Sequence, residues 1–332
     1  MTNLERRSFL AGTSSIALLL SARCLAAPFL HTTEAASGSL PIIDTHIHLF
    51  DPTRPAGVPW PEKSDTVLYQ PALPPRYKSL AAPFGVVGAI AVECSPWPED
   101  NHWLLRVAAK DTIMVGVIGD LDPIALTFPR QLERLSANPL FLGIRYGNLW
   151  GRNLGSRLSE PEFVANLKRL SNAGLLLETA NPNPALIADI LRLTERIPEL
   201  RIVIDHLPQA PPPMDPAARK AYERDLWALS QRNNIFVKGS EVFRQVDGKI
   251  PTDLNFYRPW LDEIWEIFGE NRLMYGSDWP NSDHLAPYAD TFDIIRRYIT
   301  GKGPQAVDKF FWKNSIGIYR WRKRAADQPS PS

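Results

Sequence analysis

The chain has 332 residues, a formal net charge of +1 at pH 7 and 44% hydrophobic residues. This length is enough for one large α/β barrel or two smaller domains. The balanced charge gives no reason to expect nucleic acid or an anionic membrane surface as a partner, and it is compatible with a small-molecule substrate.

Residues 1–36 have the features of an export signal followed by a linker. Arg6 and Arg7 precede Ser-Phe-Leu, and a short apolar run covers residues 16–20. The pattern resembles a twin-arginine signal, which predicts transport by the twin-arginine export machinery to a periplasmic or secreted location. An ordinary secretory signal and an uncleaved anchor are the alternatives. The apolar run is too short to span a bilayer as a mature helix, so stable membrane insertion is not expected.

The chain has two cysteines, Cys24 and Cys94. Cys24 lies in the signal region, so the mature protein is expected to have no internal disulfide. Cys94 is predicted to be a small buried residue rather than a nucleophile.

Short apolar runs alternate with amphipathic stretches over residues 37–322. Eight runs are predicted strands, because they are rich in Val, Ile and Leu and end in polar residues: 41–50, 85–95, 112–122, 141–147, 174–180, 201–208, 234–243 and 272–280. Helical patterns lie between or after them at 98–110, 159–174, 183–198, 215–233, 258–270 and 304–321. Residues 323–332 are polar and are predicted to form a disordered tail.

This order of elements predicts the fold class. Eight βα units in about 280 residues match a single-domain (β/α)8 TIM-like barrel with a parallel sheet. A doubly wound open sheet is the rival, but it would need a glycine-rich phosphate turn after its first strand. The first strand instead ends in "HIHLFDP", which has no glycine.

The first predicted strand contains an unusual polar pattern, "PIIDTHIHLFDP" at residues 41–52. Strand side chains alternate between faces, so Asp44, His46 and His48 are expected on one face and Ile43, Thr45 and Ile47 on the other. Solvated strand faces seldom carry paired imidazoles. The two histidines are therefore predicted to point into a site, with locally satisfied interior histidines as the alternative.

Polar residues recur where the other predicted strands end, which is where TIM-barrel enzymes place catalytic groups. They are Glu93, Cys94, Ser95, Asp120, Asp122, Arg145, Glu178, Thr179, His206, Lys238, Ser240, Glu241 and Asp278. Alternation predicts that Arg145 faces the barrel interior with Phe141 and Gly143, and that Asp278 does so with Met274 and Gly276. His206 is predicted to share the inner face with Ile202 and Ile204, which turns Asp205 toward the helix layer or a loop.

The motifs "DTHIHLFDP", "GIRYG", "IVIDHLP" and "MYGSDWP" together resemble the amidohydrolase superfamily, in its amidohydrolase-related branch. The resemblance covers about residues 40–321, and it is nearest to lactone hydrolases. It implies that His46 and His48 are the family's first-strand pair, that His206 is the strand-six histidine and that Asp278 activates water. Arg145 then matches an arginine that binds an anionic or hydroxylated substrate.

The resemblance also bears on the metal. Metal-rich members carry a bridging lysine or glutamate on strand four and a histidine on strand five, where this chain has Arg145 and Glu178, so a binuclear centre is not expected. A single Zn²⁺ on His46, His48, His206 and Asp278 has suitable ligand types. Lactonases of this branch can also work without metal, so the sequence leaves both states open.

These residues permit hydrolysis of a cyclic ester. Asp278 can take a proton from water, while histidines and Arg145 can donate to the developing oxyanion. The other predicted substrate-binding residues are Glu93, Trp97, Glu241 and Trp279; Trp150 also follows a strand, and Lys238 is a weaker candidate for the mouth of the site. Each has a structural alternative: Arg145 as an ion pair with Glu93 or Glu178, His206 paired with Asp205, Asp278 as a loop cap, and the tryptophans as loop anchors.

The sequence therefore predicts an exported hydrolase that opens a lactone of a sugar acid or small carboxylic acid. Three alternatives remain: a metal-dependent amidohydrolase acting on C–N bonds, a non-oxidative decarboxylase of the same superfamily, and a non-catalytic ligand-binding protein. The loops carry no readable code for the substrate. A homo-oligomer is compatible with the sequence, which does not specify the oligomeric state.

Overall fold

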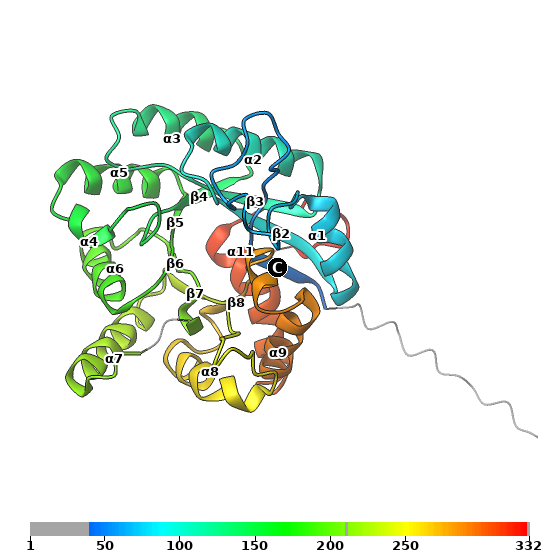
Figure 1. Cartoon of the computed structure of the whole chain (residues 1–332). Coiled ribbons are helices and arrows are strands. Elements are labelled where there is room, and N and C mark those ends of the chain that lie inside the picture. Colours follow the sequence, from blue (N-terminus) through cyan, green and yellow to red (C-terminus); the bar gives the residue numbers. More distant parts are fainter. Residues whose placement is uncertain (1–39, 210–211, 331–332) are drawn as a thin grey trace, which may run out of the picture. The chain divides into compact units, whose positions relative to one another are not determined.

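A computed structural model describes residues 40–209 and 212–330. Eight parallel strands follow one another around a barrel in chain order (Figure 1). They are β1 (Ile42–Ile47), β2 (Val86–Val92), β3 (Met114–Gly119), β4 (Phe141–Arg145), β5 (Leu176–Thr179), β6 (Ile202–Ile204), β7 (Ile235–Gly239) and β8 (Leu273–Tyr275). The ends of β1 and β8 meet through hydrogen bonds from His48 N to Trp279 O (2.7 Å) and from Asp278 N to His46 O (2.8 Å). The predicted (β/α)8 barrel is confirmed.

Helices surround the strands (Figure 1). They are α1 (Pro74–Ala81), α2 (Pro98–Lys110), α3 (Phe128–Ser136), α4 (Leu154–Arg157), α5 (Pro161–Asn172), α6 (Pro184–Arg196), α7 (Pro216–Ser230), α8 (Leu254–Phe268), α9 (Tyr288–Thr300), α10 (Pro304–Asp308) and α11 (Asn314–Tyr319). Proline in the first turn sets several starts, and Asn183 and Asp215 cap α6 and α7 by accepting a backbone N–H. Helices α1, α3, α4 and α9 lie in segments for which the sequence predicts no helix. The predicted single helix over residues 304–321 is divided by a π-helical turn at Lys309–Lys313.

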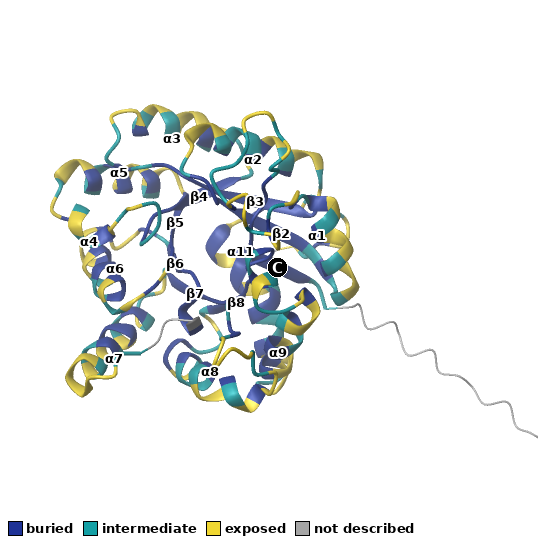
Figure 2. Cartoon of the chain, viewed as in Figure 1, coloured by how far each residue is buried: buried dark blue, intermediate teal, exposed yellow. Residues whose placement is uncertain are grey.

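Side chains from every strand fill the barrel interior. The strands are coloured as buried in Figure 2. Each strand contributes at least one buried apolar residue to a cluster of Ile43, Ile90, Val92, Val115, Ile118, Leu142, Leu176, Val203, Phe236 and Met274. Ile316, Ile318, Tyr319 and Trp321 from the C-terminal segment join this cluster and close one end of the barrel. The opposite end, where the strands have their carboxyl termini, is left for the site.

The C-terminal tail corrects one expectation. Gln328 is buried and donates from Nε2 to the carbonyl oxygens of Val87 (2.9 Å) and Thr112 (2.7 Å). Arg324 donates to the carbonyl oxygens of Ala108 and Asp111. The described part of the tail is therefore bound to the barrel, because its polar side chains satisfy free carbonyl groups, a role that polar composition alone did not indicate.

The predicted export signal, residues 1–36, lies outside the described residues and stays a prediction. Within residues 40–209 and 212–330, no helix is long and apolar enough to cross a bilayer.

Candidate active site

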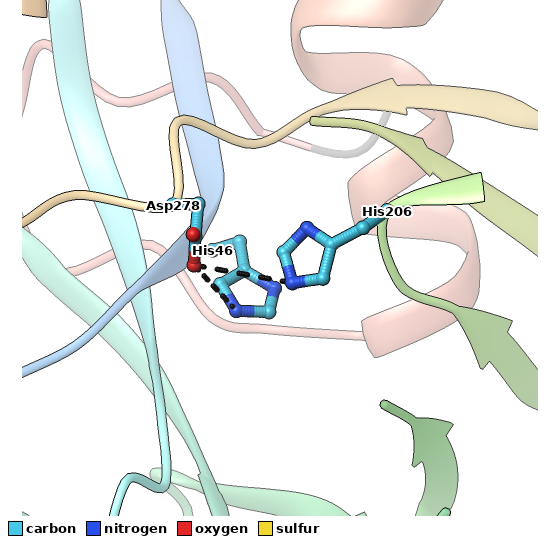
Figure 3. A group of neighbouring side chains, drawn as sticks. All are labelled: His46, His206 and Asp278. Carbon is cyan, nitrogen blue, oxygen red and sulfur yellow. Dashed lines mark ion pairs between the residues drawn. The ribbon is translucent and has the colours of Figure 1, made fainter. Parts of the chain in front are cut away.

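Three histidines surround one carboxylate oxygen at the carboxyl ends of the strands. Asp278 Oδ1 lies 3.3 Å from His46 Nε2, 3.1 Å from His48 Nε2 and 3.9 Å from His206 Nε2. All four residues are at least 95% buried. Figure 3 shows His46 and His206 turned toward Asp278 from different strand ends. The sequence placed these four residues at the ends of strands one, six and eight, and the barrel brings them together.

The backbone departs from regular strand geometry to make this arrangement. The β1–β2 pairing shifts between Asp44 and Ile47, so Ile43 packs inside the barrel while Ile47 packs in the outer cluster. Asp44 accepts hydrogen bonds from the Tyr77 hydroxyl (2.8 Å) and the Ser277 amide (2.9 Å). The predicted single polar face of Asp44, His46 and His48 is therefore wrong, because the bulge separates Asp44 from the two histidines.

The second ring nitrogens hold the imidazoles in place. His48 Nδ1 lies 3.0 Å from the Val92 carbonyl oxygen and must donate to it. His206 Nδ1 lies 2.8 Å from Ser240 Oγ. His46 Nδ1 lies 3.0 Å from Lys238 Nζ. Each ring orientation is thus set by a partner outside the four-residue cluster.

A buried charge cluster lies against His46. Lys238 Nζ donates to Glu178 Oε2 at 2.7 Å and lies 3.0 Å from Asp205 Oδ1, and all three side chains have no exposed surface. Lys238 belongs to β7 rather than to the loop after it, so it lies inside the barrel and not at its mouth. Glu178 also accepts a hydrogen bond from Tyr319. The ammonium group balances two carboxylates that could not both remain charged alone.

Asp205 corrects the predicted faces of β6. Val203 belongs to the interior cluster, whereas Ile202 and Ile204 pack outside, so alternation turns Asp205 inward. His206 nevertheless reaches the site because its backbone is left-handed, with φ of 51°. Two adjacent residues therefore both face the interior. In β4 the predicted face was also wrong, since Phe141 packs outside and Leu142 inside, although Arg145 does face inward.

Burial and charge set the protonation states. Burial holds the pKa of His46 well below its usual value and lowers the pKa of His206 to about 4, so both rings are neutral at pH 7. Burial opposes the charge on Asp278, but the surrounding histidines hold its pKa well below the usual range. Burial raises the pKa of Glu241 well above its usual value, and the negative charge of Asp278 raises it further. The pKa values of the two carboxyl groups are thus shifted in opposite directions.

Arg145 is engaged by carboxylates. Its Nε donates to Glu93 Oε1 at 2.7 Å, its Nη2 donates to the Glu93 carbonyl oxygen at 2.6 Å, and its Nη1 lies 3.8 Å from Asp205 Oδ2. Glu93 also accepts from the Trp150 indole N–H at 3.1 Å and the Ser95 amide at 3.1 Å. The Arg145–Glu93 ion pair that the sequence left as an alternative is therefore present in the structure, and Arg145 also lines the cavity that opens onto Asp278.

A cavity of about 220 Å³ opens onto Asp278. Its described lining residues are His48, Trp60, Cys94, Arg145, Leu149, Trp150, Ala180, Asn181, His206, Glu241, Asp278 and Asn281. Asn281 donates to Asp278 Oδ2 at 2.7 Å and to Glu241 Oε1 at 3.0 Å, which links the two carboxyl groups. The volume suits a monocyclic ligand.

The family model described as amidohydrolase matches residues 43–321, which is most of the chain. The chain belongs to this amidohydrolase family. A curated L-fucono-1,5-lactonase from Burkholderia ambifaria is 29% identical over 299 residues, covering 86% of this chain and 98% of the relative. A solved amidohydrolase structure from Burkholderia multivorans with bound zinc has a TM-score of 0.72 at 20% identity, covering 85% of this chain and 99% of that one. A probable 2-pyrone-4,6-dicarboxylic acid hydrolase from Acinetobacter baumannii has a TM-score of 0.68 at 20% identity, covering 84% and 99%.

The four-residue cluster of this amidohydrolase has suitable geometry for one divalent ion. Zinc–ligand bonds of 2.0–2.1 Å in a tetrahedron place neighbouring ligand atoms about 3.3 Å apart. His46 Nε2, His48 Nε2 and Asp278 Oδ1 are separated by 3.3, 3.3 and 3.1 Å, and His206 Nε2 completes the set at 3.9 Å from Asp278. His46 can ligate through Nε2 only with its proton on Nδ1, so ligation would replace the hydrogen bond that Lys238 Nζ donates to Nδ1 at 3.0 Å with one from Nδ1 toward Asp205 Oδ1, now 3.7 Å away. The donor set therefore fits the ion.

Of the other substrate-binding residues predicted for this amidohydrolase, only one lines the cavity. Glu241 lines it, but Glu93 lies behind Arg145 and Trp150. Trp97 is 37% exposed and lies near Arg54, outside the lining, and Trp279 is fully buried against Tyr77. Trp60, Asn181 and Asn281 also line the cavity but were not predicted from the sequence, and only Asn281, three residues after Asp278, has a sequence signal.

Proposed function

We propose that this amidohydrolase hydrolyses the lactone of a sugar acid, with Asp278 as the base that activates water. The observation that carries the proposal is one ionised carboxylate oxygen facing three imidazoles at the base of a ring-sized cavity. Membership of the amidohydrolase family and the likeness to an L-fucono-1,5-lactonase support the reaction class.

The proposed reaction uses the two carboxyl groups in opposite ways. Asp278 takes a proton from water as the water oxygen bonds to the lactone carbonyl carbon. The ring C–O bond then breaks, and Glu241, which lines the same cavity, supplies the proton that the departing ring oxygen needs. The product is an open-chain hydroxy acid. A divalent ion on His46, His48, His206 and Asp278 would, when bound, polarise the water or the carbonyl.

The charges around the cavity support an uncharged substrate. Of the described residues that line it, Arg145 alone carries a permanent positive charge, and Glu93 and Asp205 already engage its guanidinium. The other polar lining groups include the amides of Asn181 and Asn281 and the carboxyl groups of Glu241 and Asp278. Amides and carboxyl groups pair well with hydroxyl groups, whereas a second carboxylate would add repulsion. A polyhydroxylated lactone therefore suits this cavity better than a carboxylated one.

A proton-release assay on the signal-free protein tests this function. We expect six-membered sugar lactones to be hydrolysed with kcat/KM at least 100-fold above that for pyrone carboxylates and carboxylated muconolactones. Equal or better turnover of carboxylated lactones would contradict the charge argument. Release of carbon dioxide or ammonia from other substrates, with every lactone inert, would favour the decarboxylase or the C–N hydrolase.

Metal addition tests the proposed ion separately from activity. Protein dialysed against a chelator and then given Zn²⁺ is expected to gain stability, about 2.7 kcal/mol at a hundredfold excess over Kd. The gain in Tm should vanish in the double variant His46→Ala/His48→Ala and persist in His102→Ala, which changes a helix α2 residue outside the cluster. An equal Tm shift in both variants would place the ion elsewhere.

A further inference from the structure

The loop after β4 presents one aromatic side chain to the cavity. Trp150 is partly buried and lines the cavity that also contains Asp278 and His48. Its backbone is left-handed, with φ of 56°, and Gly151 follows with φ of 69°. A left-handed conformation disfavours a bulky side chain by about 1 kcal/mol or more, so the surrounding contacts must hold it.

The first set of contacts acts on the indole itself. Trp150 Nε1 donates to Glu93 Oε2 at 3.1 Å. Glu93 is held in turn by Arg145, through Nε at 2.7 Å and Nη2 at 2.6 Å, and by the Ser95 amide. These buried charge-assisted bonds are of the strong kind, and together they position the indole ring.

A second set holds the same loop on either side of Trp150. Arg152 forms a bidentate ion pair with Asp120 and lies 5.3 Å from the centroid of the Tyr146 ring. Asn148 and Asn181 each donate from the side-chain amide to the other's carbonyl oxygen, at 3.1 and 2.9 Å. The loop that carries Trp150 is therefore attached to the ends of β2, β3 and β5.

The strained backbone at Trp150 is part of a wider pattern. The segments after β4, β5, β6, β7 and β8 each place one left-handed non-glycine residue at the site, namely Trp150, Asn181, His206, Glu241 and Asp278, while Asp247, also left-handed, lies away from it in the segment after β7. All five line the same cavity. Strain that recurs at one cavity, and that glycine would relieve, indicates that these five side chains are needed there.

We propose that Trp150 is the specificity-determining residue that binds the C–H face of the lactone ring. The inference rests on the proposed function and adds a substrate feature: a ring with one face free of hydroxyl groups, able to lie flat on the indole. Glu93 and Arg145 are positioning residues that hold the indole rather than ligands of the substrate. Trp97 and Trp279, which follow strands in the same way, have no such place in the cavity.

The experiment compares Trp150→Ala and Trp150→Phe with Trp97→Ala as the matched control. For a six-membered sugar lactone, we expect Trp150→Ala to raise KM at least tenfold while kcat changes less than threefold. The inhibition constant of the corresponding lactam, which resists hydrolysis, should rise by the same factor. Trp150→Phe keeps a ring but loses the bond to Glu93, so its KM should lie between those of wild type and Trp150→Ala.

Each outcome decides between specific possibilities. A KM for Trp150→Ala within twofold of the Trp97→Ala value, in a protein with wild-type Tm, would overturn the inference and leave the lactonase proposal standing. A fall in kcat and Tm with unchanged lactam affinity would make Trp150 a structural loop anchor and also overturn it. A folded wild type that hydrolyses no lactone and binds no lactam would refute the proposed function, and this inference with it.

Discussion

Replacing Asp278 with Asn is expected to lower kcat/KM for the best lactone by about 10³-fold, within the range that general bases contribute. Asparagine has nearly the same shape, and its carbonyl oxygen can still accept from Asn281, whose Nδ2 lies 2.7 Å from Asp278 Oδ2. It cannot take a proton from water. Tm should stay near the wild-type value, because the change removes a charge without opening a cavity. Initial rates of proton release measure kcat/KM, and a thermal melt measures Tm.

Asp283→Asn is the matched control for this change. Asp283 lies in the same loop, within the 3₁₀ turn Asn281–His284, but it is not part of the histidine cluster. Its carboxylate pairs with Arg76, at 3.4 Å. Its activity is expected to remain within threefold of wild type. If Asp278→Asn kept more than a tenth of the wild-type kcat/KM, another group would have to activate water, and the assignment of Asp278 as the base would be wrong.

The cluster around Asp278 could be predicted because parallel strands in a barrel share one carboxyl end. His46, His48, His206 and Asp278 were placed there from strand boundaries alone, without any knowledge of distances. These four side chains come together as long as each strand ends where its apolar run ends. Local backbone details, such as the β1 bulge and the left-handed φ at His206, change which neighbours accompany them but do not change which end of the barrel they occupy.

Asp205 and Arg145 show what the sequence could not supply. Strict alternation allows only one of two adjacent residues to face inward, so His206 was chosen over Asp205 when in fact both do. The family resemblance implied that Arg145 binds substrate, with an ion pair to Glu93 or Glu178 as the alternative, and in the structure Arg145 pairs with Glu93, 52 residues away in the chain. Which carboxylate meets a given guanidinium depends on tertiary register, and no local pattern encodes it.

Lys238→Met is expected to lower the free energy of unfolding by about 3–5 kcal/mol at pH 8, since it leaves buried charges without their partner. Glu178 and Asp205 lose an ammonium group that lies 2.7 and 3.0 Å from their oxygens, and neither carboxyl group is exposed to water. Chemical denaturation with urea, followed by circular dichroism, measures the change. Lys78→Met is the surface control, because Lys78 is 51% exposed in its pair with Asp111 and should contribute less than about 1 kcal/mol.

The sign of the pH dependence makes this test specific. Burial, then the charge of Asp205, already raise the pKa of Glu178 to about 7 in the folded wild type, above its ordinary value. Without Lys238, the pKa of Glu178 in the folded state should rise further above its value in the unfolded state. The variant should therefore regain stability as pH falls. The loss relative to wild type should therefore be smaller at pH 5 than at pH 8.

The double variant Lys238→Met/Glu178→Gln removes one of the unpaired buried charges while keeping an acceptor for Tyr319, and it should recover part of the lost stability. A pH-independent loss that the double variant does not reduce would mean that Lys238 stabilises the barrel through packing rather than charge.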